Sequence, residues 1–232
     1  MGKWSEKILQ KKNYKYINRF SECWVPDVPG DNNLAGELSH PAKKPAISLK
    51  YIGLLSRFDT GPATTGKNKK DHLLLIFSGP EPQRSILENK LITEIAHYKS
   101  TATILRGLPG ETRLVPSTGM IQFYNHLPAD ELSKEIEKAE YVISRSGYSS
   151  IMDLGILQKK TILIPTPGQT EQEYLAAYLL QKKIALCIQQ KDFSLDRALE
   201  KAGTFSYQPV THTNGQLLSS VVSAFISGLT KV

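Results

Sequence analysis

Short apolar runs, each about as long as a buried strand, recur along this chain and alternate with segments that have helical spacing. The runs occupy residues 73–77, 101–105, 120–124, 141–143, 161–164 and 184–188. Runs of this length bounded by turn residues are consistent with strands in the core of a sheet. We therefore expect six strands in the carboxyl-terminal two thirds of the chain.

The segments between these runs repeat apolar residues every three or four positions, as helices with one buried face do. Helices are predicted at residues 82–98, 128–139, 151–157, 171–182, 194–202 and 214–229. Strands that alternate with helices argue for a parallel sheet covered on both faces. The predicted fold class is therefore α/β, with a Rossmann-like doubly wound parallel sheet.

The amino-terminal part has a weaker pattern. Residues 1–20 are polar and basic with helical spacing, and short strands are predicted at 20–27 and 47–52, on either side of a loop rich in Pro, Gly and Asn. Residues 59–71 are polar throughout, which predicts a mobile loop. The start of the chain lacks the strand or helix cap that would begin a domain.

The most informative stretch is residues 141–165, which reads as strand, turn, helix and strand. In a parallel sheet, the turn after the first strand lies at the carboxyl end of the sheet, where open α/β folds bind ligands. Ser146, Gly147, Ser149 and Ser150 make up this turn, so hydroxyls and backbone N–H groups gather at a helix N-terminus, an arrangement suited to phosphate. Ser150 and Asp153 also match a capping box, which needs no ligand.

Composition and charge narrow the function classes only in part. A chain of 232 residues with 40% hydrophobic content can bury a core, and a net charge of +7 favours an anionic partner. The lysines occur as scattered pairs without interleaved aromatics, and no nucleic-acid-binding motif is visible, so nucleic acid is not predicted as a partner. No apolar run resembles a signal peptide or a membrane span, and we expect a cytoplasmic protein.

The cysteines and histidines give no sign of a metal or cofactor. Cys23 and Cys187 stand far apart among apolar neighbours, as buried reduced thiols do. The five histidines are dispersed and no Asp-x-Asp sequence occurs. We therefore predict neither a metal site nor a cofactor.

The central unit, taken with the residues that follow it, resembles the carboxyl-terminal, donor-binding domain of the GT-B glycosyltransferases of family 28. The resemblance rests on a series in the family's order and spacing: Ser144-Arg-Ser-Gly-Tyr-Ser-Ser-Ile-Met-Asp153, Gly155, Thr161-Ile-Leu-Ile-Pro165 and Glu171-Gln-Glu-Tyr-Leu-Ala176. It spans roughly residues 47–230 and is strongest over 140–180. It implies that the sheet is the carboxyl-terminal half of a GT-B fold.

The resemblance also implies roles for residues around the central turn. Ser149 and Ser150, with the N–H of Gly147, would hold the donor diphosphate, in the turn that Ser146 begins. Asp153, where the family usually has Glu, would accept hydrogen bonds from the ribose hydroxyls. Glu171 and Gln172 would meet the sugar, and Leu175 replaces an Asn of the family, which implies an altered sugar pocket.

Other implied donor-binding residues come from neighbouring loops. Ser78 and Gly79 occupy the first strand-to-helix turn, where the family has a glycine-rich loop near the phosphates. Arg57 resembles an arginine at the domain junction that reaches the nucleotide, and an ordinary exposed arginine is the alternative. His126 and Leu127 end the third strand, where the family reads the base, and an ordinary strand-end histidine is again the alternative.

The implied function is metal-independent transfer of a hexosyl group from a nucleotide-diphosphate sugar, a UDP-sugar by resemblance, to an acceptor sugar or lipid-linked sugar. A nucleotide-sugar 2-epimerase and a non-catalytic nucleotide-binding subunit are the alternatives. A GT-B enzyme needs two such domains, so we expect residues 1–46 to be the tail of an amino-terminal domain and linker, and 47–232 to be the donor-binding domain. The catalytic base would lie in the missing domain, and the fragment alone would be inactive. Peripheral association with the inner face of the membrane is compatible with this assignment.

Overall fold

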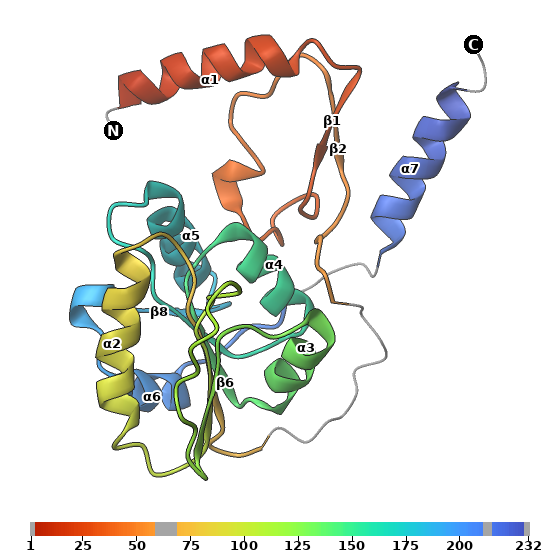
Figure 1. The fold of residues 1–232 in the computed structure, drawn as a ribbon. Helices are drawn as coiled ribbons and strands as arrows, with labels where there is room; N and C mark the ends of the chain where they lie inside the picture. The colour runs from red at the N-terminus through yellow and green to blue at the C-terminus, as the bar shows by residue number, and fades with distance from the viewer. Residues whose placement is uncertain (1–2, 59–68, 211–214, 230–232) are drawn as a thin grey trace. The chain divides into compact units, whose positions relative to one another are not determined.

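The computed structural model describes residues 3–58, 69–210 and 215–229, and it divides into two compact units (Figure 1). One unit is Ser56–Val210, and the other joins Met1–Leu55 to Thr211–Val232. Residues 47–55 and the carboxyl-terminal helix thus group with the amino-terminal segment. The predicted domain division after residue 46 stays a prediction, as does the mobile loop at 59–71, most of which lies outside the described residues.

The larger unit is built on a six-stranded sheet in which every pairing is parallel. Its strands are β3 (Leu73–Ile76), β4 (Ala102–Leu105), β5 (Ile121–Tyr124), β6 (Tyr141–Ser144), β7 (Thr161–Leu163) and β8 (Leu186–Cys187). Their order across the sheet is β5-β4-β3-β6-β7-β8. Counted from β3, this is the 3-2-1-4-5-6 order of the Rossmann fold, so the predicted fold class is confirmed.

Helices follow the strands in the predicted alternation (Figure 1). They are α2 (Gln83–Ile95), α3 (Ala129–Lys138), α4 (Tyr148–Ile156), α5 (Thr170–Gln181) and α6 (Leu195–Thr204). The last strand is shorter than predicted because the backbone N–H groups of Ile184 and Ala185 both donate to the carbonyl of Leu179. These two residues close α5, and only Leu186 and Cys187 remain for β8.

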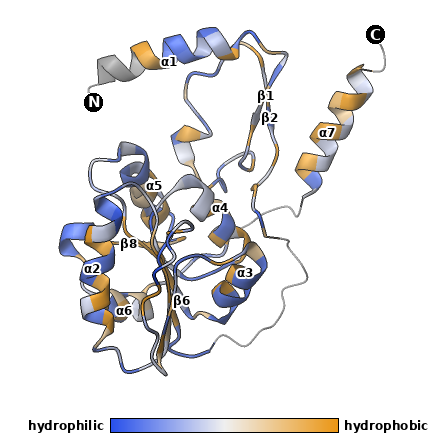
Figure 2. Cartoon of the chain, viewed as in Figure 1, coloured by the Kyte–Doolittle hydropathy of each residue, from blue (hydrophilic) through white to orange (hydrophobic). Residues whose placement is uncertain are grey.

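The core lies on both faces of the sheet, as alternation along the strands requires. Leu73 and Leu75 pack with α2 and α6 on one face. Leu74 packs with α3 and α4 on the other face. All three leucines are fully buried, and hydrophobic residues run along the central strands (Figure 2).

The smaller unit contains two long helices and a two-stranded parallel sheet. Its elements are α1 (Lys3–Ile17), β1 (Glu22–Val25), β2 (Ser48–Tyr51) and α7 (Gln216–Leu229). The buried carboxylate of Asp27 holds the intervening loop by accepting from the backbone N–H groups of Leu34 and Ala35 and from the hydroxyl of Ser39. The rings of Trp24 and Phe225 meet edge to face at 5.6 Å, which places α7 against this sheet. No helix within the described ranges has the length and apolar character of a membrane-spanning segment.

The strand order fixes where a ligand site can form. In the register of the central pair, Ile76 lies opposite Ser144, so β3 and β6 end side by side. From these ends the chain runs in opposite directions, through α2 to β4 on one side and through α4 to β7 on the other. Open α/β sheets bind ligands in the crevice at such a point.

His72 is a buried titratable group at the opposite, amino-terminal end of β3. Its side chain is 2% exposed, its Nδ1 lies 2.8 Å from Thr101 Oγ1, and its Nε2 lies 3.8 Å from Glu135 Oε2. Burial, with the nearby charge of Lys138, lowers the pKa of His72 from 6.5 to about 4. The folded protein therefore holds this imidazole neutral at a pH where the unfolded chain protonates it.

We expect this histidine to make the protein less stable in mild acid. Because its pKa is lower in the folded state, its contribution is fully present above about pH 6.5 and is lost as the pH falls towards 4. Between pH 7.5 and 5, the free energy of unfolding should fall by about 2 kcal/mol from this group. Urea unfolding of the wild type and of His72→Gln at both pH values measures this fall in the free energy of unfolding. In His72→Gln most of the fall should disappear. In the control His97→Gln, at an exposed histidine just after α2, the fall should remain.

Candidate functional site

The turn between β6 and α4 forms the centre of the carboxyl edge. Gly147 is the N-cap residue of α4, with φ −73° and ψ 144°, and no side chain caps the helix. The first-turn N–H groups of an α-helix have no acceptor within the helix, so they point out of its N-terminus. Ser149 is exposed on this turn and Ser150 is half-buried. The helix begins before Ser150, so the capping box with Ser150 as the N-cap residue is wrong.

Ser146 connects this turn to α5. Its side chain is fully buried, and its hydroxyl donates to the backbone carbonyl of Gln172 at 2.8 Å. The structure therefore brings together the Gly147 turn and the first turn of α5, which are 26 residues apart in sequence. The Ser146 hydroxyl is engaged within the protein, so its role here is to position the turn.

Gln172 is 9% exposed and its amide also bonds within the protein. Its Oε1 accepts from the backbone N–H of Thr166 at 3.0 Å, and its Nε2 donates to Gln169 Oε1 at 2.6 Å. These bonds organise the loop between β7 and α5. Glu171, beside it in the first turn of α5, is exposed.

Asp153 faces the segment that leads into the sheet. Its Oδ1 accepts from the Ser56 hydroxyl at 2.6 Å and from the Arg57 backbone N–H at 3.3 Å, and its Oδ2 accepts from Arg57 Nε at 3.1 Å. The Asp153 side chain is 10% exposed, whereas that of Arg57 is 54% exposed. Two residues that the sequence suggested separately, 96 positions apart, thus form one ion pair.

The turn after β3 lies against the loop after β7. Gly79 is exposed with φ +99°, a conformation that favours glycine, and a Cβ at this position would lie 3.7 Å from Thr166 Oγ1. Thr166 is 1% exposed, and its hydroxyl has no hydrogen-bond partner in the part of the chain that the structure describes. Ser78, just before Gly79, is half-buried. This turn therefore lies beside the loop after β7 at the carboxyl edge.

His126 and Leu127 lie farther along the same edge, after the outermost strand β5. His126 is exposed, Leu127 is 4% exposed and packs in the core, and Asn125 before them holds the 111–113 segment through its amide. Three strand spacings separate β5 from β6, or roughly 14 Å. Only an extended ligand could contact both this strand end and the Gly147 turn.

Sequence reasoning did not single out Arg145 or Thr166. Arg145 is 1% exposed and donates to three backbone carbonyls, those of Gln83, Ile164 and Pro165. The signal was present, because an arginine directly after a buried apolar strand must find partners inside the protein. Thr166 gave no comparable signal, because a threonine in a Pro-Gly loop is ordinary.

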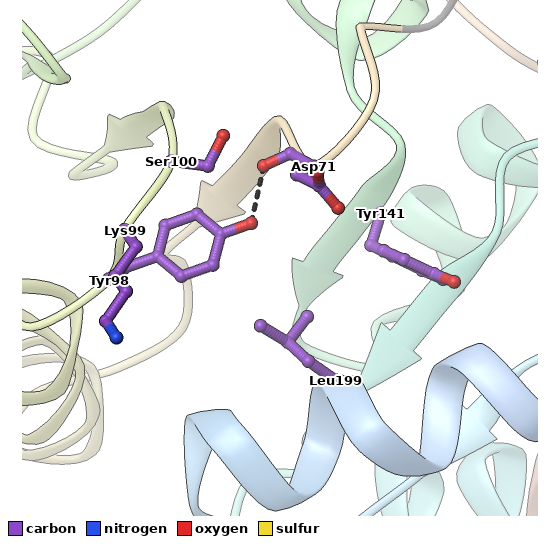
Figure 3. Close-up of a pocket in the computed structure, with 6 residues that line it drawn as sticks. All are labelled: Asp71, Tyr98, Lys99, Ser100, Tyr141 and Leu199. Atoms are coloured by element: carbon purple, nitrogen blue, oxygen red, sulfur yellow. Dashed lines mark hydrogen bonds between the residues drawn. The ribbon is translucent and has the colours of Figure 1, made fainter.

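The cavity drawn in Figure 3 lies at the other end of the sheet. It has a volume of about 290 Å³ and is lined by Asp71, Tyr98, Lys99, Ser100, Tyr141 and Leu199. Asp71 and Ser100 come just before β3 and β4, and Tyr141 begins β6, so this is the amino-terminal edge. The Tyr98 hydroxyl donates to the carbonyl of Asp71 across it. This cavity therefore takes no part in the carboxyl-edge site.

A comparison with protein families matches residues 117–222 to the glycosyltransferase family 28 C-terminal domain. Two similar curated proteins are both named UDP-N-acetylglucosamine--N-acetylmuramyl-(pentapeptide) pyrophosphoryl-undecaprenol N-acetylglucosamine transferase. The one from Rhodopseudomonas palustris (strain HaA2) is 28% identical over 114 residues, which are 48% of this chain and 28% of the relative. The one from Rickettsia akari (strain Hartford) is 34% identical over 74 residues, 31% of this chain and 19% of the relative. The aligned part of the chain thus spans less than a third of either relative's length.

Solved structures agree on the fold. The glycosyltransferase SnogD from Streptomyces nogalater superposes with a TM-score of 0.54 at 10% identity, covering 87% of this chain and 55% of SnogD. The spinosyn forosaminyltransferase SpnP gives a TM-score of 0.51 at 12% identity, covering 78% of this chain and 46% of SpnP. At these identities the likeness is one of fold, and it is to part of a GT-B glycosyltransferase.

The sequence match and the Rossmann-like sheet lead to the same assignment. The sequence match covers the chain from just before β5 into α7, including the β6–α4 turn and α5. Residues 117–222 therefore match the C-terminal domain of glycosyltransferase family 28 in sequence, and the fold agrees with that match.

Proposed function

We propose that this chain is the donor-binding part of a glycosyltransferase that transfers a hexosyl group from a UDP-sugar to an acceptor hydroxyl. The observation that carries the proposal is the β6–α4 turn, which presents Gly147, Ser149 and Ser150 at a helix N-terminus beside the strand switch point. It lies inside the segment that matches family 28. The comparisons do not favour a 2-epimerase.

The proposed donor would lie along the carboxyl edge of the sheet. Its diphosphate would bind the N–H of Gly147 and the hydroxyls of Ser149 and Ser150, with Ser78 and Gly79 on the opposite wall. The sugar would lie towards Glu171 and Gln172. This arrangement places the departing phosphate at the positive end of α4, where the helix dipole and N–H groups stabilise the charge that develops in the transition state.

The nucleoside would extend in the other direction, along the strand ends. The ribose would lie by Asp153, whose carboxylate already accepts from Ser56 and Arg57, so binding would involve an exchange of hydrogen-bond partners. Arg57, with its exposed side chain, would then turn towards the nucleotide. The base would lie towards His126 and Leu127 at the end of β5.

The acceptor and the catalytic base would lie in a domain other than the donor-binding domain that residues 117–222 match. Transfer requires a group that removes the proton of the acceptor hydroxyl, and we place it in a second domain across the cleft. The acceptor is then a sugar or a lipid-linked sugar, as the names of the relatives describe for those proteins. The chain should bind the donor and show no transfer by itself.

Titration calorimetry with UDP and with uridine tests the donor site. Ser149→Ala should weaken UDP binding by roughly tenfold or more, because a hydrogen bond to a charged group contributes about 1.5–3 kcal/mol. Its affinity for uridine, which lacks phosphate, should stay the same. Asp153→Asn should weaken both ligands by the same factor, because both carry the ribose.

The control for this experiment is Ser133→Ala. Ser133 lies in α3, which is not part of the β6–α4 turn. It should bind UDP as the wild type does. Equal UDP affinity in Ser149→Ala and Ser133→Ala would show that the diphosphate does not bind at the β6–α4 turn. A wild-type protein that binds neither UDP nor UDP-sugars would contradict the proposed function itself.

We also propose that α1 binds the anionic surface of the cytoplasmic face of the membrane. Tyr14 and Ile17 are partly buried, and the Tyr14 hydroxyl donates to the Lys43 carbonyl, which sets the inward side of the helix. The exposed residues of α1 and the turn after it combine basic and apolar side chains: Lys11, Lys12, Lys15 and Arg19 with Ile8, Leu9, Tyr16 and Phe20. Basic and aromatic residues together on one helix are typical of segments that lie in the membrane interface.

Sedimentation with vesicles tests this surface. The triple variant Lys11→Gln, Lys12→Gln, Lys15→Gln should lose roughly 100-fold in affinity for vesicles rich in phosphatidylglycerol, because each lysine near an anionic surface contributes about 1 kcal/mol. The matched control is Lys182→Gln, Lys183→Gln, Lys191→Gln, which removes three exposed charges from the other unit. If both triple variants bind these vesicles equally, the lysines act only through the net charge of the protein, and α1 is not the membrane-binding surface. Vesicles of phosphatidylcholine alone should bind neither the wild type nor either triple variant.

A further inference from the structure

Arg145 is a fully buried cation at the centre of the carboxyl edge. It follows β6 directly and precedes the turn of Ser146 and Gly147, and 1% of it is exposed. Burial lowers the pKa of the Arg145 guanidinium to about 10, so it still carries its charge at neutral pH. A charge held out of water needs compensation from its surroundings.

The compensation within the protein comes from backbone carbonyls. Arg145 Nη1 donates to the carbonyls of Ile164 and Pro165 at 3.2 and 3.3 Å, and Nη2 donates to the carbonyl of Gln83 at 2.8 Å. Gln83 begins α2, and the other two carbonyls follow β7. The guanidinium therefore ties together the three chain segments that surround the strand switch point.

The second buried arginine of this unit provides a contrast. Arg84 is 6% exposed, and its guanidinium pairs with Glu88 at 2.8 Å and Glu81 at 2.6 Å. Within the described residues, no carboxylate forms an ion pair with Arg145, and burial is the only cause of its pKa shift. Its Nε is also buried and has no hydrogen-bond partner among residues 3–58, 69–210 and 215–229. Carbonyl dipoles satisfy some of the N–H groups of Arg145, and no carboxylate of the described segments balances its positive charge.

A second unsatisfied polar group lies at the same edge. The Thr166 hydroxyl is 1% exposed and has no hydrogen-bond partner, and it lies beneath Gly79, on the loop that begins with the Arg145-bound carbonyls. Buried polar groups of folded proteins are nearly always paired, so two exceptions at one edge are informative. Both lie in loops at the carboxyl edge, and neither belongs to the hydrophobic clusters on the two faces of the sheet.

We propose that Arg145 is a positioning residue for an anionic donor: its buried charge, held beneath the Ser146–Ser150 turn, is neutralised by the donor's diphosphate. This inference rests on the proposed function and adds a residue to it. A fixed charge in a poorly solvated place attracts an anion more strongly than an exposed lysine does, because little water screens it. By holding three loops, Arg145 also keeps the N–H groups of α4 aimed at the same anion.

The test compares UDP with uridine on two matched variants. Arg145→Met removes the charge and keeps the length of the side chain. Lys159→Met is the control, because the ammonium of Lys159 also donates to two backbone carbonyls, those of Glu137 and Ala139, but at the amino-terminal edge of the sheet. Both variants lose one positive charge, so any effect of net charge on UDP binding is the same in the two.

The expected result is a loss of UDP affinity of about tenfold or more in Arg145→Met, with uridine affinity unchanged, and a change of less than about twofold in Lys159→Met. Arg145→Lys, which keeps the charge, should bind UDP more tightly than Arg145→Met does. Should Arg145→Met not fold, Arg145→Gln, which keeps amide donors for the carbonyls, takes its place in the same comparison.

Three outcomes would overturn the inference. If Arg145→Met binds UDP as the wild type does, the charge serves only the fold, and the proposed function stands. If UDP and uridine lose affinity equally, Arg145 acts only by shaping the loops. If the wild type itself binds neither ligand, the proposed donor site fails and this inference fails with it.

Discussion

The burial of a parallel sheet on both faces is the constraint from which the rest of the larger unit follows. Leu73, Leu74 and Leu75 are all fully buried although they point alternately to opposite faces, so the central strands carry mainly apolar side chains. Polar side chains gather mainly at the strand ends, and Thr103, which lies within β4, donates its hydroxyl hydrogen to Glu135. The order β5-β4-β3-β6-β7-β8 then separates the outgoing connections of β3 and β6, and the polar loops meet at the edge between them, where open α/β sheets bind ligands.

Hydrogen bonds connect the loops at the carboxyl edge to one another. The Ser146 hydroxyl ties the β6–α4 turn to α5, and the Gln172 amide ties α5 to the loop after β7. Arg145 adds the start of α2 to the same set. All three side chains are buried, so each bond forms where competing water is scarce. These hydrogen bonds therefore link the loops of the carboxyl edge into one network.

Local patterns in the sequence were sufficient for the sheet and for the β6–α4 turn. Apolar runs placed all six strands, and the failure at β8 was local, because two of its predicted residues close α5. The same patterns did not predict which side chains form hydrogen bonds with each other. Asp153 meets Ser56 and Arg57 across almost 100 residues, and Gln172 turns inward to Thr166. Such contacts depend on how loops from different strands fold together, which periodicity does not encode. For this reason the implied roles of Asp153 and Gln172 stay predictions.

The internal partners of the candidate site also bear on how it could discriminate between ligands. A ligand that takes over the bonds of Asp153 or Gln172 replaces one hydrogen bond with another, so the net gain from each exchange is small. The charge of Arg145 differs, because no carboxylate among the described residues forms an ion pair with it and it would attract an anion without losing such a partner. In this arrangement the affinity for a nucleotide-sugar would come chiefly from its diphosphate. Asp153 and Gln172 would select among ribose and sugar hydroxyls. A ligand that breaks the bond of Asp153 to Arg57, or of Gln172 to the Thr166 N–H, without replacing it leaves a buried polar group unpaired.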